Sequence, residues 1–123
     1  MNQQTQITEL YSLEAEQAVL GAILMENSIY DRMTFLSFED FYDPMHAKTY
    51  ELSGKLISEG RTVTGAVLAT LLKEEEIDDF NVGQYFSELT GSGVMSTLAV
   101  EYARAILEYS LRRKLSAALG DMS

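Results

Sequence analysis

The residues most able to do chemistry lie in the stretch FEDFYDPMH, residues 38–46, which holds the only histidine and the only proline of the chain. One interpretation is a small metal-dependent enzyme that uses Asp40, Asp43 and His46, since carboxylate and imidazole groups bind metals and transfer protons. The other is helix-start chemistry, with Asp43 as the N-cap, Pro44 at the first helical position and His46 in the first turn. We favour the helix start, because a zinc site with one histidine and no cysteine would need three carboxylates or waters, which is uncommon.

Aromatic residues alternate with acidic ones in the same stretch. We expect the rings of Phe38, Phe41 and Tyr42 to form an apolar plug that holds the loop down, while the acidic side chains point to water. The imidazole of His46 would reach back toward the cap or pack under this loop. The expected structural cap and loop anchor therefore consists of Phe41, Tyr42, Asp43, Pro44 and His46. We expect these residues to have no catalytic, cofactor-binding or metal-binding role.

The rest of the chain contains no recognisable catalytic motif. The pair Gly54-Lys55 lacks the upstream glycine of a phosphate-binding loop, and the segment GSGVMS at 91–96 has no lysine. The dinucleotide-binding fingerprint, the HExxH and CxxC motifs and the nucleophile elbow are also missing from the sequence. We therefore expect no cofactor in this chain.

Charge and composition indicate an acidic protein whose partners are other proteins. The 123 residues are enough for one domain, and nine Lys and Arg against nineteen Asp and Glu give a net charge of −10. A field of this sign repels phosphates, so we expect weak or no direct binding of nucleic acid. The chain has no cysteine, its first residues are polar, and no apolar run approaches the length of a membrane span. These features predict a cytoplasmic protein without membrane contact.

Hydrophobic residues recur with helical spacing in almost every segment. Ser12 and Thr64 are candidate N-caps, Gly60 is a stop signal and the GSG triplet at 91–93 is a candidate hinge. The predicted fold is all-α, a compact bundle of about five short helices followed by one long helix. The expected helices cover about 13–25, 29–36, 44–59, 82–89 and 97–119, and a further helix after Thr64 is expected to end in the charged KEEEIDD stretch at 73–79. The expected organisation is a flexible tail over 1–11, a globular helical domain over 12–93 and the long helix within 94–123.

The long helix carries two apolar stripes. The first consists of Val100, Ala103, Leu107, Leu111 and Leu115, continued by Ala118. The second consists of Leu98, Tyr102, Ile106 and Tyr109. Two stripes imply contacts on two sides of one helix. Either one stripe meets the domain and the other is partly exposed, or the first stripe forms an oligomer interface.

Two charged runs also leave alternatives open. The acidic run at 74–79 is either a solvated loop or a docking site for a basic partner. The basic run Arg112-Arg113-Lys114 lies toward the end of the long helix, where cations complement the helix dipole. Its other interpretation is a contact with a neighbouring subunit or a further domain.

Three blocks of the sequence resemble the N-terminal domain of DnaB-type replicative DNA helicases, and their divergence from the family pattern suits a phage or plasmid version. They are SLEAEQAVLGAIL at 12–24, DFYDPMHAKTYELSGKLISEG at 40–60 and EYARAILEYSLRRKL at 101–115. The resemblance covers nearly the whole chain. It departs from the family pattern at Thr64, where the family usually has aspartate, and around Gly83, where a second glycine is missing.

The resemblance implies a non-catalytic collar domain whose long helix is the first arm of a helical hairpin. In such helicases hairpins of neighbouring subunits pair and the domains form a collar, a trimer of dimers, in a hexameric ring. The expected partners are a second copy of the chain, primase and, as in some systems of the family, a helicase loader. The expected interface residues are Val100, Ala103, Leu107, Leu111 and Leu115. ATP and Mg are expected only in a motor domain that these residues lack, so the chain is expected to stop before the second hairpin arm. The alternative is a free-standing replication adaptor, either a helicase loader or the helicase-binding domain of a primase.

Overall fold

Seven helical elements and no strand make up the computed structural model, which describes residues 9–72 and 81–122. Within these ranges the predicted all-α fold is confirmed, and no helix there is long and apolar enough to cross a membrane. In chain order the elements are α1 (Leu13–Met25), the 3-10 helices η2 (Asn27–Met33) and η3 (Phe38–Asp40), α2 (Pro44–Ser58), α3 (Gly65–Leu72), α4 (Val82–Gly91) and α5 (Ser96–Met122).

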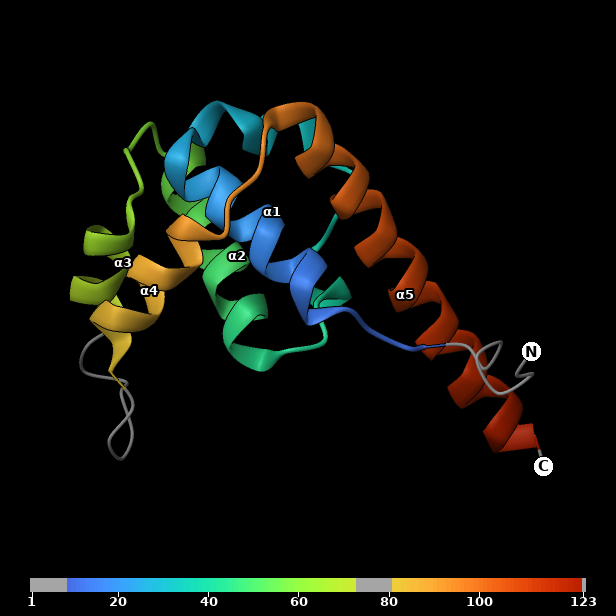
Figure 1. Ribbon diagram of the computed structural model, residues 1–123. Coiled ribbons are helices and arrows are strands. Elements are labelled where there is room, and N and C mark those ends of the chain that lie inside the picture. Colours follow the sequence, from blue (N-terminus) through green and yellow to red (C-terminus); the bar gives the residue numbers. More distant parts are fainter. Residues whose placement is uncertain (1–8, 73–80, 123) are drawn as a thin grey trace, which may run out of the picture.

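Helix α1 is the centre of the fold and packs against α5, α4, α2 and η2 (Figure 1). The Ser12 hydroxyl caps it by accepting a hydrogen bond from the backbone N–H of Ala15 at 3.1 Å. Nearly all of its residues from Ala15 to Leu24 are buried. A helix covered on several sides needs apolar or small residues around most of its circumference, and the sequence AVLGAIL supplies them.

The segment after α1 differs from the predicted short helix over 29–36. It forms the 3-10 helix η2 over Asn27–Met33, which has no side-chain cap at its start. The Asn27 amide donates to the carbonyls of Ile23 and Val63, and its oxygen accepts from the Val63 N–H at 2.8 Å. This residue therefore joins the end of α1 to the segment that precedes α3.

Helix α2 ends where the sequence predicts. Gly60 has a φ of +80°, a conformation that residues with a side chain rarely adopt. The backbone N–H groups of Gly60 and Arg61 donate to the carbonyls of Ile57 and Leu56, so the last turn is closed by a glycine C-cap.

Helices α3 and α4 pack against each other at one end of the molecule (Figure 1). The hydroxyl of Thr64 accepts from the Val67 N–H, and the Asn81 side chain accepts from the Gln84 N–H. The acidic run at 74–79, between these two helices, lies outside the described residues.

The GSG triplet, predicted as a hinge, contains a close contact between two backbones. A methyl group on Gly21 of α1 would collide with the Leu89 carbonyl and would lie 2.6 Å from the Gly93 nitrogen. A methyl group on Gly93 would lie 2.7 Å from the Gly21 carbonyl carbon. The glycines therefore let the connection between α4 and α5 cross directly over α1.

Helix α5 runs along α1 and then projects beyond the body of the domain (Figure 1). Its buried residues are Ala99, Ala103, Ile106 and Ser110, whose spacing of four, three and four residues defines one face. After Ser110 the leucines of α5 are largely exposed, so its last turns are not part of the core.

We predict that Gly21→Ala destabilises the fold by about 2 kcal/mol or more, because the added methyl group overpacks a backbone contact. Gly91→Ala is the matched control, since a Cβ at Gly91 meets nothing within 4 Å. The control should leave stability unchanged or raise it slightly, because alanine favours helix over glycine. Urea unfolding followed by circular dichroism measures both. Equal midpoints for the two variants would show that α1 and the connection do not need this close approach.

Candidate functional site

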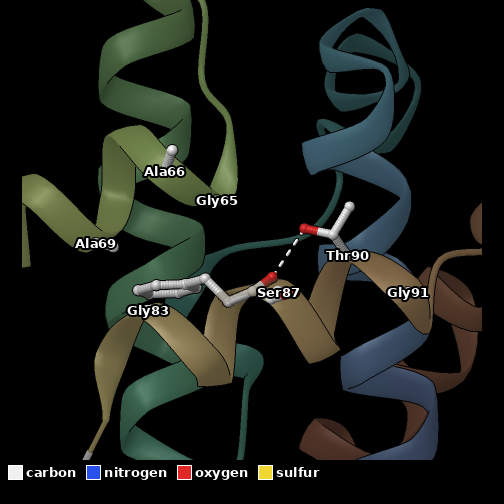
Figure 2. Close-up of a pocket in the computed structure, with 8 residues that line it drawn as sticks. Gly65, Ala66, Ala69, Gly83, Ser87, Thr90 and Gly91 are labelled. Carbon is white, nitrogen blue, oxygen red and sulfur yellow. Dashed lines mark hydrogen bonds between the residues drawn. The ribbon is translucent and has the colours of Figure 1, made fainter.

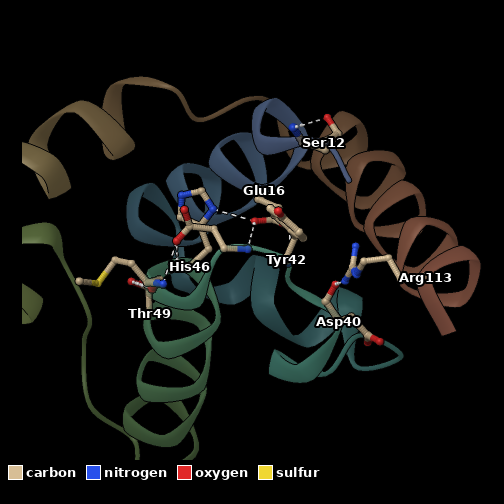
Figure 3. Close-up of polar contacts among 10 residues, drawn as sticks. Ser12, Glu16, Asp40, Tyr42, His46, Thr49 and Arg113 are labelled. Carbon is tan, nitrogen blue, oxygen red and sulfur yellow. Dashed lines mark hydrogen bonds and ion pairs between the residues drawn. The ribbon is translucent and has the colours of Figure 1, made fainter. Parts of the chain in front are cut away.

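A buried carboxylate on α1 organises the 38–46 stretch. Glu16 is 1% exposed, and its Oε1 lies 2.8 Å from His46 Nδ1 (Figure 3). The carboxylate also accepts the backbone N–H groups of Tyr42 at 2.6 Å and Asp43 at 3.3 Å. Burying a carboxylate is tolerated only when it is well paired, and here it has an imidazole and two amides.

Glu16 lies in the first turn of α1, where a carboxylate complements the helix dipole, but unlike Glu14 it is buried. It is buried because it lies on the same face as Leu20 and Ile23, four and seven residues later, and this face packs into the domain. That spacing was a usable signal in the sequence. His46 accordingly reaches across to α1 rather than back toward its own cap.

The structure places Asp43 and Pro44 at the start of α2. Asp43 Oδ1 accepts from the N–H groups of Met45 at 2.8 Å and His46 at 3.1 Å, and Pro44 occupies the first helical turn. The Asp43 carboxylate is thus engaged by the helix that it caps.

Asp40 was expected to point to water, and this expectation is wrong. It is 5% exposed, and its Oδ1 accepts a 2.7 Å hydrogen bond from the Ser110 hydroxyl on α5. Its Oδ2 accepts from the Ser37 N–H at 2.8 Å, which completes a capping box in the 3-10 turn η3. The turn therefore directs the carboxylate inward, toward α5, where Lys114 Nζ lies 3.9 Å from it.

The expected aromatic plug is reduced to one ring. Phe41 is buried and its ring centroid lies 4.9 Å from that of Tyr50. Phe38 and Tyr42 are 37% and 48% exposed, so they do not belong to the plug. The Tyr42 ring instead stacks on Tyr11 with centroids 3.9 Å apart.

The geometry does not support a metal-dependent enzyme built on Asp40, Asp43 and His46. Their side chains have different partners, namely Ser110, the amides of α2 and Glu16. Within residues 9–72 and 81–122 no group of three or more histidine and acidic side chains is arranged to hold a metal ion.

Two tyrosines border this polar cluster. Burial raises the pKa of Tyr85 well above its usual value, and the carboxylates of Asp43 and Glu16 raise it further. Burial also raises the pKa of Tyr50, with smaller contributions from Tyr30 and Asp40. Both phenols are therefore protonated at neutral pH, and the Tyr50 hydroxyl donates to the carbonyls of Met33 and Leu36.

The predicted interface residues of α5 fall into two groups. Ala103 is fully buried against its own domain, so its assignment to an oligomer interface is corrected, while Val100 and Leu107 are partly buried. The reason is that α5 packs through a face that combines members of both predicted stripes. Leu111 and Leu115 are 53% and 61% exposed, and Leu119 continues the line at 57%. We call these last three residues the leucine stripe.

A groove between α3 and α4 is a feature that the sequence did not reveal (Figure 2). It has a volume of about 770 Å³ and is lined by Gly65, Ala66, Ala69, Gly83, Phe86, Ser87, Thr90 and Gly91. None of these residues is charged, and the Thr90 hydroxyl donates to the Phe86 carbonyl of its own helix at 2.8 Å. The polar side chains of its lining are the hydroxyls of Ser87 and Thr90, so the groove has shape but no charged group that would bind an ionic ligand.

We predict that Glu16→Ala lowers the free energy of unfolding by about 3 kcal/mol, because it leaves two amides and an imidazole without their buried acceptor. Glu14→Ala, two residues away on the exposed side of α1, is the matched control and should cost less than about 1 kcal/mol.

A chelator should leave the unfolding midpoint of the unsubstituted chain unchanged. Chelator sensitivity that disappears in His46→Ala would instead support a metal site.

Comparisons with known proteins agree with this architecture. Residues 8–108 match the family described as DnaB-like helicase N terminal domain. The replicative DNA helicase DnaB of Rickettsia conorii is 29% identical over 106 residues, which cover 85% of this chain and 22% of that protein. The DnaB of Treponema pallidum is 33% identical over 107 residues, or 85% of this chain and 24% of that protein.

A solved structure gives the same result. The crystal structure of the N-terminal domain of DnaB helicase from Mycobacterium tuberculosis superposes with a TM-score of 0.80 at 26% identity, over 93% of this chain and 84% of that one. The chain spans less than a quarter of the length of the two curated relatives named above. The family match and the shared helical fold together show that this chain belongs to the DnaB-like helicase N-terminal domain family.

Proposed function

We propose that this chain is the non-catalytic collar domain of a hexameric replicative DNA helicase, where it joins subunits and docks primase or a helicase loader. Unwinding, with ATP and Mg, belongs in this proposal to a motor domain outside these residues, and the site of action is the cytoplasm. The similarity to N-terminal domains of replicative helicases supports the proposal.

The observation that carries the proposal is the leucine stripe. Its three leucines follow one another at intervals of four residues, so they lie along one side of the exposed half of α5. Side chains of this size are rarely left in water along one line unless a partner covers them. A second helix packed along this side, from another subunit or from a hairpin arm, would provide the cover.

The charge of the chain supports protein partners over nucleic acid. A net charge of −10 opposes binding to phosphates, while an apolar stripe on a helix is insensitive to this field. The proposed collar role therefore needs no direct DNA contact by this domain.

We predict that the chain self-associates. The double substitution Leu111→Glu, Leu115→Glu should weaken the association constant by about tenfold or more, since carboxylates of the two copies would then face each other. Sedimentation equilibrium over a range of concentrations measures the change. Leu98→Glu is the matched control, because Leu98 is also exposed on α5 but lies outside the stripe. A strict monomer at high concentration, unaffected by the double substitution, would contradict subunit association through α5.

We also predict that the chain, extended through a complete hairpin, retains the cognate primase in a pull-down. The primase without its C-terminal helicase-binding domain is the control and should be lost. Failure of the intact primase to bind would contradict the docking role. Retention of a separate replicative helicase in place of primase would favour the free-standing adaptor.

A further inference from the structure

One arginine of α5 faces the domain at the point where the helix leaves it. Arg113 is partly buried, while its neighbours Arg112 and Lys114 are exposed. Arg112 pairs within its own helix, with Glu108 at 3.4 Å, and lies over the ring of Tyr109. Of the two adjacent arginines, Arg113 is thus the one that reaches the body of the domain.

The guanidinium of Arg113 binds two chain segments that are distant in sequence. One nitrogen donates to the Leu10 carbonyl at 2.7 Å. Another donates to the Asp40 carbonyl, also at 2.7 Å (Figure 3). The same group lies over the Tyr42 ring, 5.6 Å from its centroid. A planar group with several donors suits such a bridge, which the single ammonium of lysine cannot reproduce.

The two segments are also joined to each other and to α5. The rings of Tyr11 and Tyr42 are stacked at an interplanar angle of 7°, which holds residues 9–11 on the loop before α2. The Asp40 carboxylate accepts from Ser110, one turn before Arg113. We call this set of contacts the Arg113 clamp; its members are Leu10, Tyr11, Asp40, Tyr42, Ser110 and Arg113.

The clamp holds α5 at Ser110 and Arg113, level with Leu111 at the start of the leucine stripe, and Lys114 Nζ lies 3.9 Å from the same Asp40 carboxylate. Because α5 is one continuous helix over Ser96–Met122, its exposed half takes its direction from the contacts that hold the part before it. The contacts of Ser110 and Arg113 lie at the end of that held part and so limit how far the exposed half can tilt.

We propose that Arg113 is a positioning residue for the association surface: with residues 9–11 as a strap, it fixes the direction of the exposed half of α5. This rests on the proposed subunit contact through the leucine stripe. It adds that the chain's N-terminal segment and the Asp40 loop control the geometry of that contact without touching the partner.

The direct test measures the direction of α5 within one molecule. The chain has no cysteine, so Glu51→Cys on α2 and Ser116→Cys on α5, both at exposed positions, accept spin labels at these two sites alone. Pulsed electron resonance on labelled chains diluted into unlabelled ones then reports the distance distribution between the helices.

We expect Arg113→Gln to broaden this distribution about twofold, because the exposed half of α5 then samples more directions. Arg112→Gln, which removes the same charge from the adjacent position, should leave it unchanged. Tyr11→Ala loosens the strap without altering α5 and should broaden the distribution as Arg113→Gln does. It also keeps the test valid if the arginine variant fails to fold.

Sedimentation of the same variants tests the link to association. Arg113→Gln should weaken self-association about threefold or more, because binding of the second copy must then also order the exposed half of α5. Arg112→Gln should leave self-association unchanged. If the unsubstituted chain does not associate, the proposed function fails, while the distance measurement still tests the clamp. Distributions of equal width in Arg113→Gln, Tyr11→Ala and Arg112→Gln would overturn the inference, whatever the association shows.

Discussion

The rest of the structure depends on the buried carboxylate of Glu16. This carboxylate accepts hydrogen bonds from two loop amides and pairs with the His46 imidazole. It brings the loop before α2 onto α1, and this position aligns Asp43 with the first turn of α2. The same loop directs Asp40 toward Ser110 and so anchors α5. One charged side chain on the central helix thus determines where two other helices begin or are held, because an unpaired carboxylate in that place would be very costly.

Local chemistry in the sequence predicted most of the fold. The caps at Ser12, Thr64 and Asp43, the stop at Gly60 and the apolar periodicity each depend on neighbours within a few residues, so helix positions followed from them. The second helix is a 3-10 helix with other bounds than predicted, and its first residue, Asn27, bonds to Val63, a partner far along the chain.

The candidate site was less predictable for the same physical reason. Glu16, Asp40 and Arg113 look like surface charges in the sequence, but each is paired with a segment that only the tertiary fold brings near. The burial of Ala103 likewise follows from how α5 lies on α1, since its stripe alone is compatible with either face. The hydrogen-bond partners of such residues can be predicted only when the spatial arrangement of the helices is known.

The exposed half of α5 also behaves mechanically as a lever arm. At about 1.5 Å per residue, Leu119 lies about 14 Å beyond Ser110, so a tilt of about 10° at the base moves it by about 2 Å. In a closed ring each subunit must meet the next at a fixed angle, and small angular errors add around the circle. In the proposed ring, the short hydrogen bonds at Ser110 and Arg113 would therefore matter more for closure than their contribution to the stability of a single chain suggests.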